Sequence, residues 1–170
     1  MRLPCPRRFD GVLLLLLLAM TSAAWATDYY VDPSSANAYP NVQAAVDAVS
    51  GQSEFDRANI FIAPGSYNEL VSVAEPYISF IGTGATPDAT RIVFSKRWSS
   101  GGQVVAIQSG ATAFMARNIT IENSLPDQNV APGLAVRSDA DRTVFDNVRF
   151  LGYQDTLFVE TNSRQYFRNC

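Results

Sequence analysis

The feature that most constrains the fold is a six-residue pattern that recurs in the second half of the chain. Ala-Arg-Asn-Ile-Thr-Ile at 116–121 is similar to Phe-Asp-Asn-Val-Arg-Phe at 145–150, and Phe-Arg-Asn-Cys at 167–170 starts the pattern again. The three asparagines are 29 and 22 residues apart. Periods in this range favour a parallel β-helix, in which each coil stacks on the next. We expect the asparagines to form an inward ladder whose amides hydrogen-bond along the axis.

The remaining segments suit an all-β solenoid with a short capping helix. One helical pattern covers 42–49, where apolar residues share one face, Asn41 is a plausible N-cap and Gly51 follows the end. This helix would cap the first coil. Strands rich in β-branched and aromatic residues are expected at 60–63, 71–74, 78–81, 91–94, 104–108, 114–122, 134–137, 143–151, 156–159 and 165–170.

The N-terminus resembles a secretory signal. Arg2, Arg7 and Arg8 precede an apolar run at 11–20, and Ala-Trp-Ala ends at Ala26. We expect a signal peptide over 1–26, cleavage after Ala26, and a partial β-helix domain over 27–170. The alternative, a transmembrane anchor, would need a longer apolar run. The expected product is secreted and extracellular, or periplasmic if retained, and is not held in the membrane after cleavage.

Composition excludes several function classes. Without residues 1–26 the chain has 10 basic and 15 acidic groups, and it lacks a basic stripe, so nucleic acid is not an expected partner. A neutral, esterified polymer suits this surface better. The chain contains no His, which excludes Ser-His-Asp catalysis, Cys-His catalysis and His-bearing zinc sites within these residues. Only Cys170 remains after cleavage, so no disulfide can form within the mature chain.

The strongest candidate for chemistry is the segment Leu-Gly-Tyr-Gln-Asp-Thr-Leu-Phe at 151–158. A carboxyl group among apolar residues, here Asp155, can hold a proton near neutral pH. The neighbouring amide of Gln154 can stabilise an oxyanion. The alternative is a strand-to-turn corner in which the aspartate binds backbone N–H groups. Neighbours on a flat strand face opposite ways, so both can line one cleft only if the backbone bends, which Gly152 would allow.

Other motifs have simpler interpretations. Residues 65–69 are expected to form a turn with a solvated Glu69, and residues 139–141 a turn in preference to a calcium site. Tyr153 is expected in the cleft, where it could stack on sugar rings, and Phe158 in the core. Asn118 begins a glycosylation sequon, but a place in an inner ladder would prevent its modification.

Several blocks resemble the pectinesterase (pectin methylesterase) family. They lie at 39–46, 65–69, 81–84, 116–120 and, most specifically, Gly-Tyr-Gln-Asp-Thr-Leu at 152–157. The resemblance implies a right-handed parallel β-helix, a single-stranded pectin-lyase-like solenoid. It also implies removal of methyl groups from esterified homogalacturonan without a metal or other cofactor. A monomer that acts on methyl-esterified pectin is therefore expected.

The resemblance also implies residue roles. Asp155 stands where the family has its general acid/base, and Gln154 where it has an oxyanion-stabilising amide. Pro132 stands where the family has a second amide donor, and proline has no N–H to donate. The nucleophilic aspartate belongs to an Asp-Phe-Ile-Phe-Gly block expected after residue 170. We therefore expect an N-terminal portion, truncated at its C-terminus within a coil, that is inactive alone.

Two rival functions remain open. A non-catalytic, pectinesterase-like β-helix that binds carbohydrate is favoured by Pro132. A different polysaccharide-active β-helix is the other class, either a lyase or a glycosidase. A lyase would need calcium and a basic groove residue, and an inverting glycosidase would need a second carboxylate near Asp155. The nearest acids, Asp146 and Glu160, are not convincingly placed for that role.

Overall fold

The computed structural model describes residues 26–98, 102–126, 132–160 and 163–170. Its elements follow one another along the chain, and strands predominate. The elements are β1 Thr27–Val31, α1 Val42–Ala48, β2 Ala58–Ile62, β3 Gly65–Asn68, β4 Val71–Val73, β5 Ile78–Gly82, the 3₁₀-helix η1 Pro87–Ala89, β6 Thr90–Phe94, β7 Gln103–Ile107, β8 Met115–Asn123, β9 Leu134–Ser138, β10 Thr143–Leu151, β11 Leu157–Val159 and β12 Gln165–Arg168.

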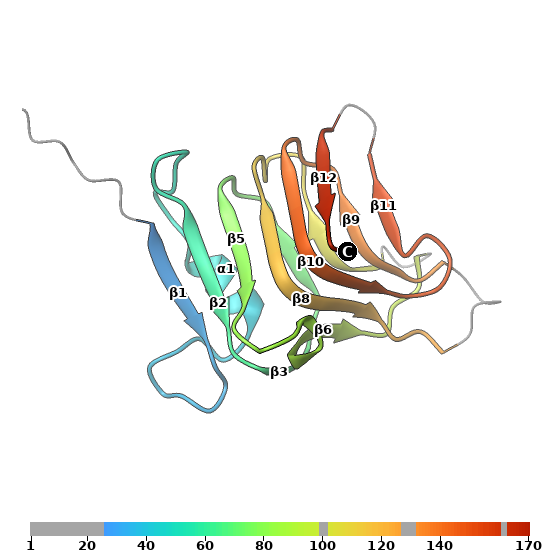
Figure 1. Cartoon of the computed structure of the whole chain (residues 1–170), viewed down its shortest axis with the longest axis horizontal. Helices are drawn as coiled ribbons and strands as arrows, with labels where there is room; N and C mark the ends of the chain where they lie inside the picture. Colours follow the sequence, from blue (N-terminus) through green and yellow to red (C-terminus); the bar gives the residue numbers. More distant parts are fainter. Residues whose placement is uncertain (1–25, 99–101, 127–131, 161–162) are drawn as a thin grey trace, which may run out of the picture.

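The strands form two parallel sheets that the chain visits in turn. Sheet A has the order β1-β2-β5-β8-β10-β12, with β3 paired to β6 and β6 to β8, and sheet B has the order β11-β9-β7-β4. Figure 1 shows the strands of sheet A side by side in chain order, from β1 to β12. This is a parallel β-helix, as the repeat predicted, and the ten predicted strands are all present. The pattern missed β1, which pairs in parallel with β2, and β3, which pairs in parallel with β6.

The recurring asparagines mark a bend within the long strands β8 and β10 and again just after β12. Asn118, Asn147 and Asn169 have φ values of 53°, 55° and 55°, a left-handed conformation that asparagine tolerates better than most residues. The first part of β8 pairs with β5 and the part beyond Asn118 pairs with β6. The bend therefore lets one nine-residue strand continue the ladders of two shorter ones.

The amide ladder exists, but it does not point inward. Asn147 Nδ2 donates to Asn118 Oδ1 at 2.9 Å, and Asn118 Nδ2 donates to the carbonyl oxygens of Gly82 and Gly84 at 3.0 and 2.7 Å. Both asparagines are half-buried and line an open cavity on the outside of sheet A. The inward expectation is wrong because the left-handed bend turns the amide outward, while Ile119 after it is fully buried.

Gly82 is required by the same bend. A Cβ atom at Gly82 would lie 2.0 Å from the carbonyl oxygen of Asn118 in the next coil. The segment at residues 82–84 is therefore a close approach between coils.

The core consists of inward side chains that stack from coil to coil. Phe114 packs between Phe80 and Phe145, with ring centroids 5.0 and 6.2 Å apart, and all three are fully buried. Burial of each ring contributes about 2 kcal/mol to folding. Sheet B adds an inward row in register across its four strands: Val71, Val105, Val136 and Leu157.

The capping helix forms where predicted. Asn41 Oδ1 accepts a hydrogen bond from the Ala44 N–H at 2.8 Å, and Gly51 lies just past the end with a φ of 76°. Val42, Ala45 and Val46 are buried against the first coil. Among the described residues no helix has the length and apolarity needed to cross a membrane. The predicted signal peptide lies outside the described residues except for Ala26, so its cleavage stays a prediction.

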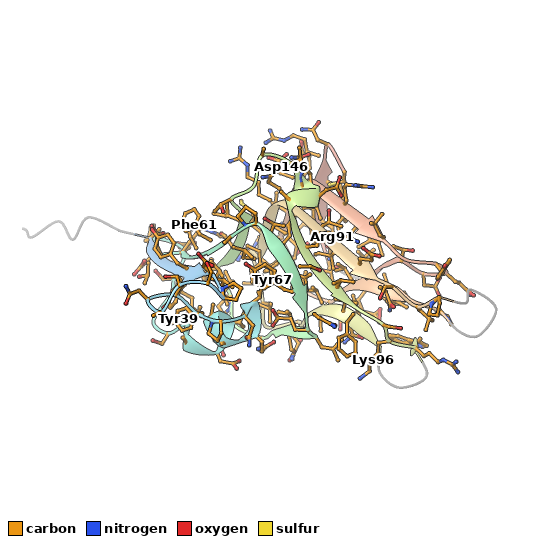
Figure 2. The ribbon with its side chains drawn as sticks, turned by 90° about the horizontal axis from the view of Figure 1, so that it is seen from below. Tyr39, Phe61, Tyr67, Arg91, Lys96 and Asp146 are labelled. Carbon is orange, nitrogen blue, oxygen red and sulfur yellow. The ribbon has the colours of Figure 1, made fainter. Side chains whose placement is uncertain are left out.

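The expectation of a turn with a solvated Glu69 is wrong. Residues 65–68 form β3, and Tyr67 is buried with its hydroxyl donating to the carbonyl oxygen of Ala63 at 2.9 Å. Glu69 accepts the N–H groups of Val42 and Gln43 at 2.8 and 2.9 Å. A carboxylate at a helix N-terminus is favourable, so Glu69 fixes the cap to the first coil. Tyr67 lies near the centre of the molecule in Figure 2.

Candidate active site

The Gln-Asp pair lies in the turn between β10 and β11. The backbone carbonyl of Gln154 accepts a hydrogen bond from the Gly133 N–H at 3.1 Å, and Thr156 Oγ1 donates to the Tyr153 carbonyl at 2.6 Å. The Thr156 carbonyl accepts the N–H groups of residues 135 and 136 at 2.8 and 3.1 Å. The turn is therefore fixed to the start of β9 by its backbone, which leaves the side chains of Gln154 and Asp155 available.

The predicted bend at this site is present. Asp155 has a φ of 55°, and a Cβ atom at Gly152 would lie 2.5 Å from the carbonyl oxygen of Gly133. Only glycine allows that approach, so Gly152 brings the turn against β9.

The apolar surroundings expected for Asp155 are not present. Gln154 and Asp155 are both exposed. Their apolar neighbour Leu157 packs against the core, while the turn carries the polar pair to the surface. Tyr153 is 42% exposed, donates to the Pro126 carbonyl at 3.4 Å and lines a cavity of about 310 Å³ beside Glu122 and Asn123. Its role in a cleft stays a prediction.

A second cavity, of about 350 Å³, lies on the outer face of sheet B. The turn that holds Gln154 and Asp155 is followed directly by β11 of this sheet. We call it the sheet B groove. One outward row crosses the sheet in register, with Ser72 beside Ala106, Ala106 beside Arg137 and Arg137 beside Phe158. The groove is lined by the first three of these residues together with Trp98, Gln103, Ile107, Gln108 and Asp139.

Phe158 is part of this outer face and not of the core. Its ring lies 6.2 Å from that of Trp98, and the Arg137 guanidinium carbon lies 5.6 Å from each ring centroid. Cations are attracted to aromatic faces at such distances. The core expectation for Phe158 is wrong because its neighbour Leu157 takes the inward position, and successive strand residues face opposite ways.

Carboxylates fix the orientation of Arg137. Its Nε lies 2.9 and 3.1 Å from the two carboxylate oxygens of Asp139, and its Nη2 lies 3.5 Å from Glu160. The hydrogen bond that Arg137 donates to Asp139 raises the pKa of Arg137, and desolvation by burial acts against it. Sequence reasoning missed Arg137 and Trp98. The alternation within 134–138 could have placed Arg137 outward, but no local pattern joins Trp98 to it.

The two aspartates near this face have arginine partners. Asp139 pairs with Arg137, and Asp141 binds Arg164 through both carboxylate oxygens, which holds the pKa of Asp141 far below its usual range. These contacts account for the 139–141 segment without a metal ion.

Comparison of the sequence and the fold with known proteins identifies the family of this chain. The model of the family described as Pectinesterase matches residues 28–170. The chain belongs to the pectinesterase family. Pectinesterase QRT1 of Arabidopsis thaliana is 36% identical over 154 residues, covering 82% of this chain and 40% of the relative. The pectin methylesterase structure from carrot matches with a TM-score of 0.67 at 30% identity, covering 83% of this chain and 44% of that chain.

A pectin methylesterase solved in complex with a hexasaccharide has the same fold, with a TM-score of 0.67 at 22% identity over 79% of this chain and 46% of that one. This pectinesterase-family chain thus spans less than half the length of each of the three relatives. The family and the β-helix predicted from the sequence are both confirmed.

Proposed function

We propose that this chain contributes the acid/base half of a pectin methylesterase site. The observation that carries the proposal is the exposed Gln154–Asp155 pair, which backbone hydrogen bonds hold at the edge of sheet B in a chain of the pectinesterase family. Asp155 would be the general acid/base and Gln154 the oxyanion donor. The substrate would be methyl-esterified homogalacturonan, and no metal is required.

The chemistry uses two carboxylates. A nucleophilic aspartate attacks the ester carbonyl, and the amide of Gln154 stabilises the tetrahedral oxyanion. Asp155 protonates the departing methanol, leaving an acyl-enzyme. Asp155 then takes a proton from water, whose oxygen attacks the acyl carbon and regenerates the nucleophile. The 170 residues contain no Asp-Phe-Ile-Phe-Gly-like block, so we propose that the nucleophile comes from further coils and that residues 27–170 alone are inactive.

The sheet B groove would hold the polysaccharide. Trp98 and Phe158 offer aromatic surface to the apolar faces of sugar rings, and Arg137 between them offers N–H donors to carboxyl or ester oxygens. A fold neighbour of this chain is named for its complex with a hexasaccharide, which supports a saccharide ligand. We further propose a secreted monomer that begins at Thr27. N-terminal sequencing of the exported protein tests the cleavage site.

The experiment that tests the function is a chimera. Residues 27–170 are joined to the remaining coils of the carrot enzyme, and methanol release from methylated pectin is measured. We expect release, and Asp155→Asn should lower its rate by about 10²–10⁴-fold because asparagine cannot donate the proton. Glu75→Gln, an exposed change of the same chemistry, is the control. Equal rates for both variants would remove Asp155 from its role.

The second candidate is a non-catalytic carbohydrate-binding β-helix. Pro132 favours it, because this residue stands where the family has an amide donor. Proline has no N–H group and no side-chain amide to donate a hydrogen bond. The same chimera decides between the two: a folded chimera that binds pectin but releases no methanol supports the binding protein.

A further inference from the structure

Sheet A has an outward row that the proposed reaction does not use. Side chains in direct register run along it from coil to coil: Tyr30, Phe61, Ile81, Arg117, Asp146 and Arg168. We call this the sheet A row. Its chain neighbours Val31, Phe80, Ala116 and Phe145 are buried, so the row faces outward. With strands about 4.8 Å apart, its six members span about 24 Å.

One end of the row is aromatic. The rings of Tyr30 and Phe61 are stacked with centroids 5.5 Å apart and an interplanar angle of 18°. Tyr30 is 56% exposed. The pair lines a cavity of about 330 Å³ whose other walls include Asp32 and Asn37. Aromatic surface beside polar groups is the composition that binds sugar rings, whose C–H faces are apolar and whose edges carry hydroxyls.

The other end of the row carries excess positive charge. Arg168 contacts both carboxylate oxygens of Asp146, with Nε 3.0 Å from Oδ1. Arg117 approaches Asp146 only to 3.9 Å, beyond hydrogen-bond distance, and its side chain is 63% exposed. Two guanidinium groups thus share one carboxylate. The surrounding cavity has a volume of about 560 Å³, and Asn118 and Asn147 are among the residues that line it.

The two ends face the same side of the molecule. Figure 2 places Phe61 and Asp146 along one edge, with Lys96 on the opposite side. The row belongs to sheet A, whereas Asp155 leads into sheet B, so an occupant of the row leaves the candidate active site open.

We propose that the sheet A row is a second binding site, specific for a polysaccharide of sugar acids. Carboxylates would bind Arg117, and sugar rings would pack on Tyr30 and Phe61. The occupant follows from charge complementarity, because two guanidinium groups face one carboxylate and a further carboxylate would balance the excess positive charge, whereas a neutral ester would not. The identity of the polymer rests on the proposed function, since hydrolysis of methyl esters produces free carboxylates. The row would then hold the demethylated stretch of a chain whose esterified part lies in the sheet B groove.

The test is binding of non-esterified oligogalacturonate to the whole chain, measured by calorimetry, with methyl-esterified oligomer as the comparison ligand. We expect binding that weakens with added salt, as charge pairing requires. Arg117→Ala should lower the affinity about tenfold, the effect of losing about one charge-assisted hydrogen bond. Tyr30→Ala should lower it several-fold.

Arg149→Ala is the matched control, because Arg149 is an exposed arginine on the same sheet but pairs with Asp88 outside the row. Equal losses in the Arg117 and Arg149 variants, or equal affinity for both oligomers, would overturn the proposal. Circular dichroism confirms that each variant folds. Binding without methanol release from the chimera would refute the proposed esterase while leaving this site intact, and release without binding would do the reverse.

Discussion

Two bends of the molecule each hold an acid next to an amide and use them differently. Asp146 and Asn147 lie at the bend of β10, and Gln154 and Asp155 in the turn that follows it. Each bend has a residue with a φ of 55°. At the first bend the acid binds Arg168 and the amide binds Asn118. At the second, neither side chain hydrogen-bonds to any residue that the structure describes.

The difference shows where the fold leaves polar groups free for chemistry. A left-handed residue costs about 1–2 kcal/mol unless its side chain gains something locally. At Asn147 the gain is a rung of the amide ladder. At Asp155 no side-chain contact within the described chain offsets the cost of the left-handed conformation. Backbone strain without such an offsetting contact is typical of functional sites. An acid and an amide at a bend therefore indicate a candidate site only where no residue of the described chain binds them.

The largest expected effect is on stability at the first kind of bend. Asn118→Ala should lower the free energy of unfolding by about 3 kcal/mol, since it removes three hydrogen bonds and places alanine in a left-handed conformation. Gln154→Ala should change it by less than about 0.5 kcal/mol. Urea denaturation measures both. Asn118→Gly, which keeps the backbone freedom, isolates the part due to the amide. Similar losses at Asn118 and Gln154 would break the comparison.

The next effect concerns activity at the second bend. In the chimera, Pro132→Gln should raise the rate of methanol release about tenfold or more, because it supplies an amide beside the turn that could stabilise the oxyanion. Initial rates at saturating pectin measure it. The Pro132→Ala variant controls for the loss of proline, and a gain shared by both would show that the backbone and not the amide limits the rate.

A smaller effect tests the strain at Asp155. Asp155→Gly should raise the free energy of unfolding by about 0.5–1 kcal/mol, because glycine adopts a positive φ freely and the Asp155 side chain makes no hydrogen bond within the described part of the chain. Asn147→Gly should lower it, since the contact with Asn118 is lost. Thermal or urea unfolding measures the pair, and destabilisation by Asp155→Gly would show that the carboxylate has a structural partner.

The smallest expected effect is a pH dependence at Asp146. The hydrogen bond from Arg168 lowers the pKa of Asp146 in the folded protein, against an unfolded value of about 3.9. A lowered folded pKa gives stability that is present above the unfolded value and lost as the pH falls through the folded one. The difference in urea midpoint between the wild type and Asp146→Asn should therefore shrink below about pH 4. A difference that stays constant from pH 6 to pH 3 would contradict the assigned contact.

The sequence by itself determined the repeating part of the protein. The recurrence of Asn118, Asn147 and Asn169 indicated stacked coils, because a residue repeated once per turn meets its equivalents. Asn41 and the apolar stripe after it defined the capping helix, because those signals are local. Gly152 indicated the bend at Gln154 and Asp155, and the surrounding block indicated the family.

Only the tertiary structure decided which neighbours those residues meet. Glu69 binds a helix 26 residues earlier, Phe158 meets Trp98 from another coil, and the amide ladder faces outward. These outcomes depend on the register between coils, and a shift of one residue would exchange inward and outward side chains. Local patterns state what each strand prefers, but the register is fixed by the packing of all coils together.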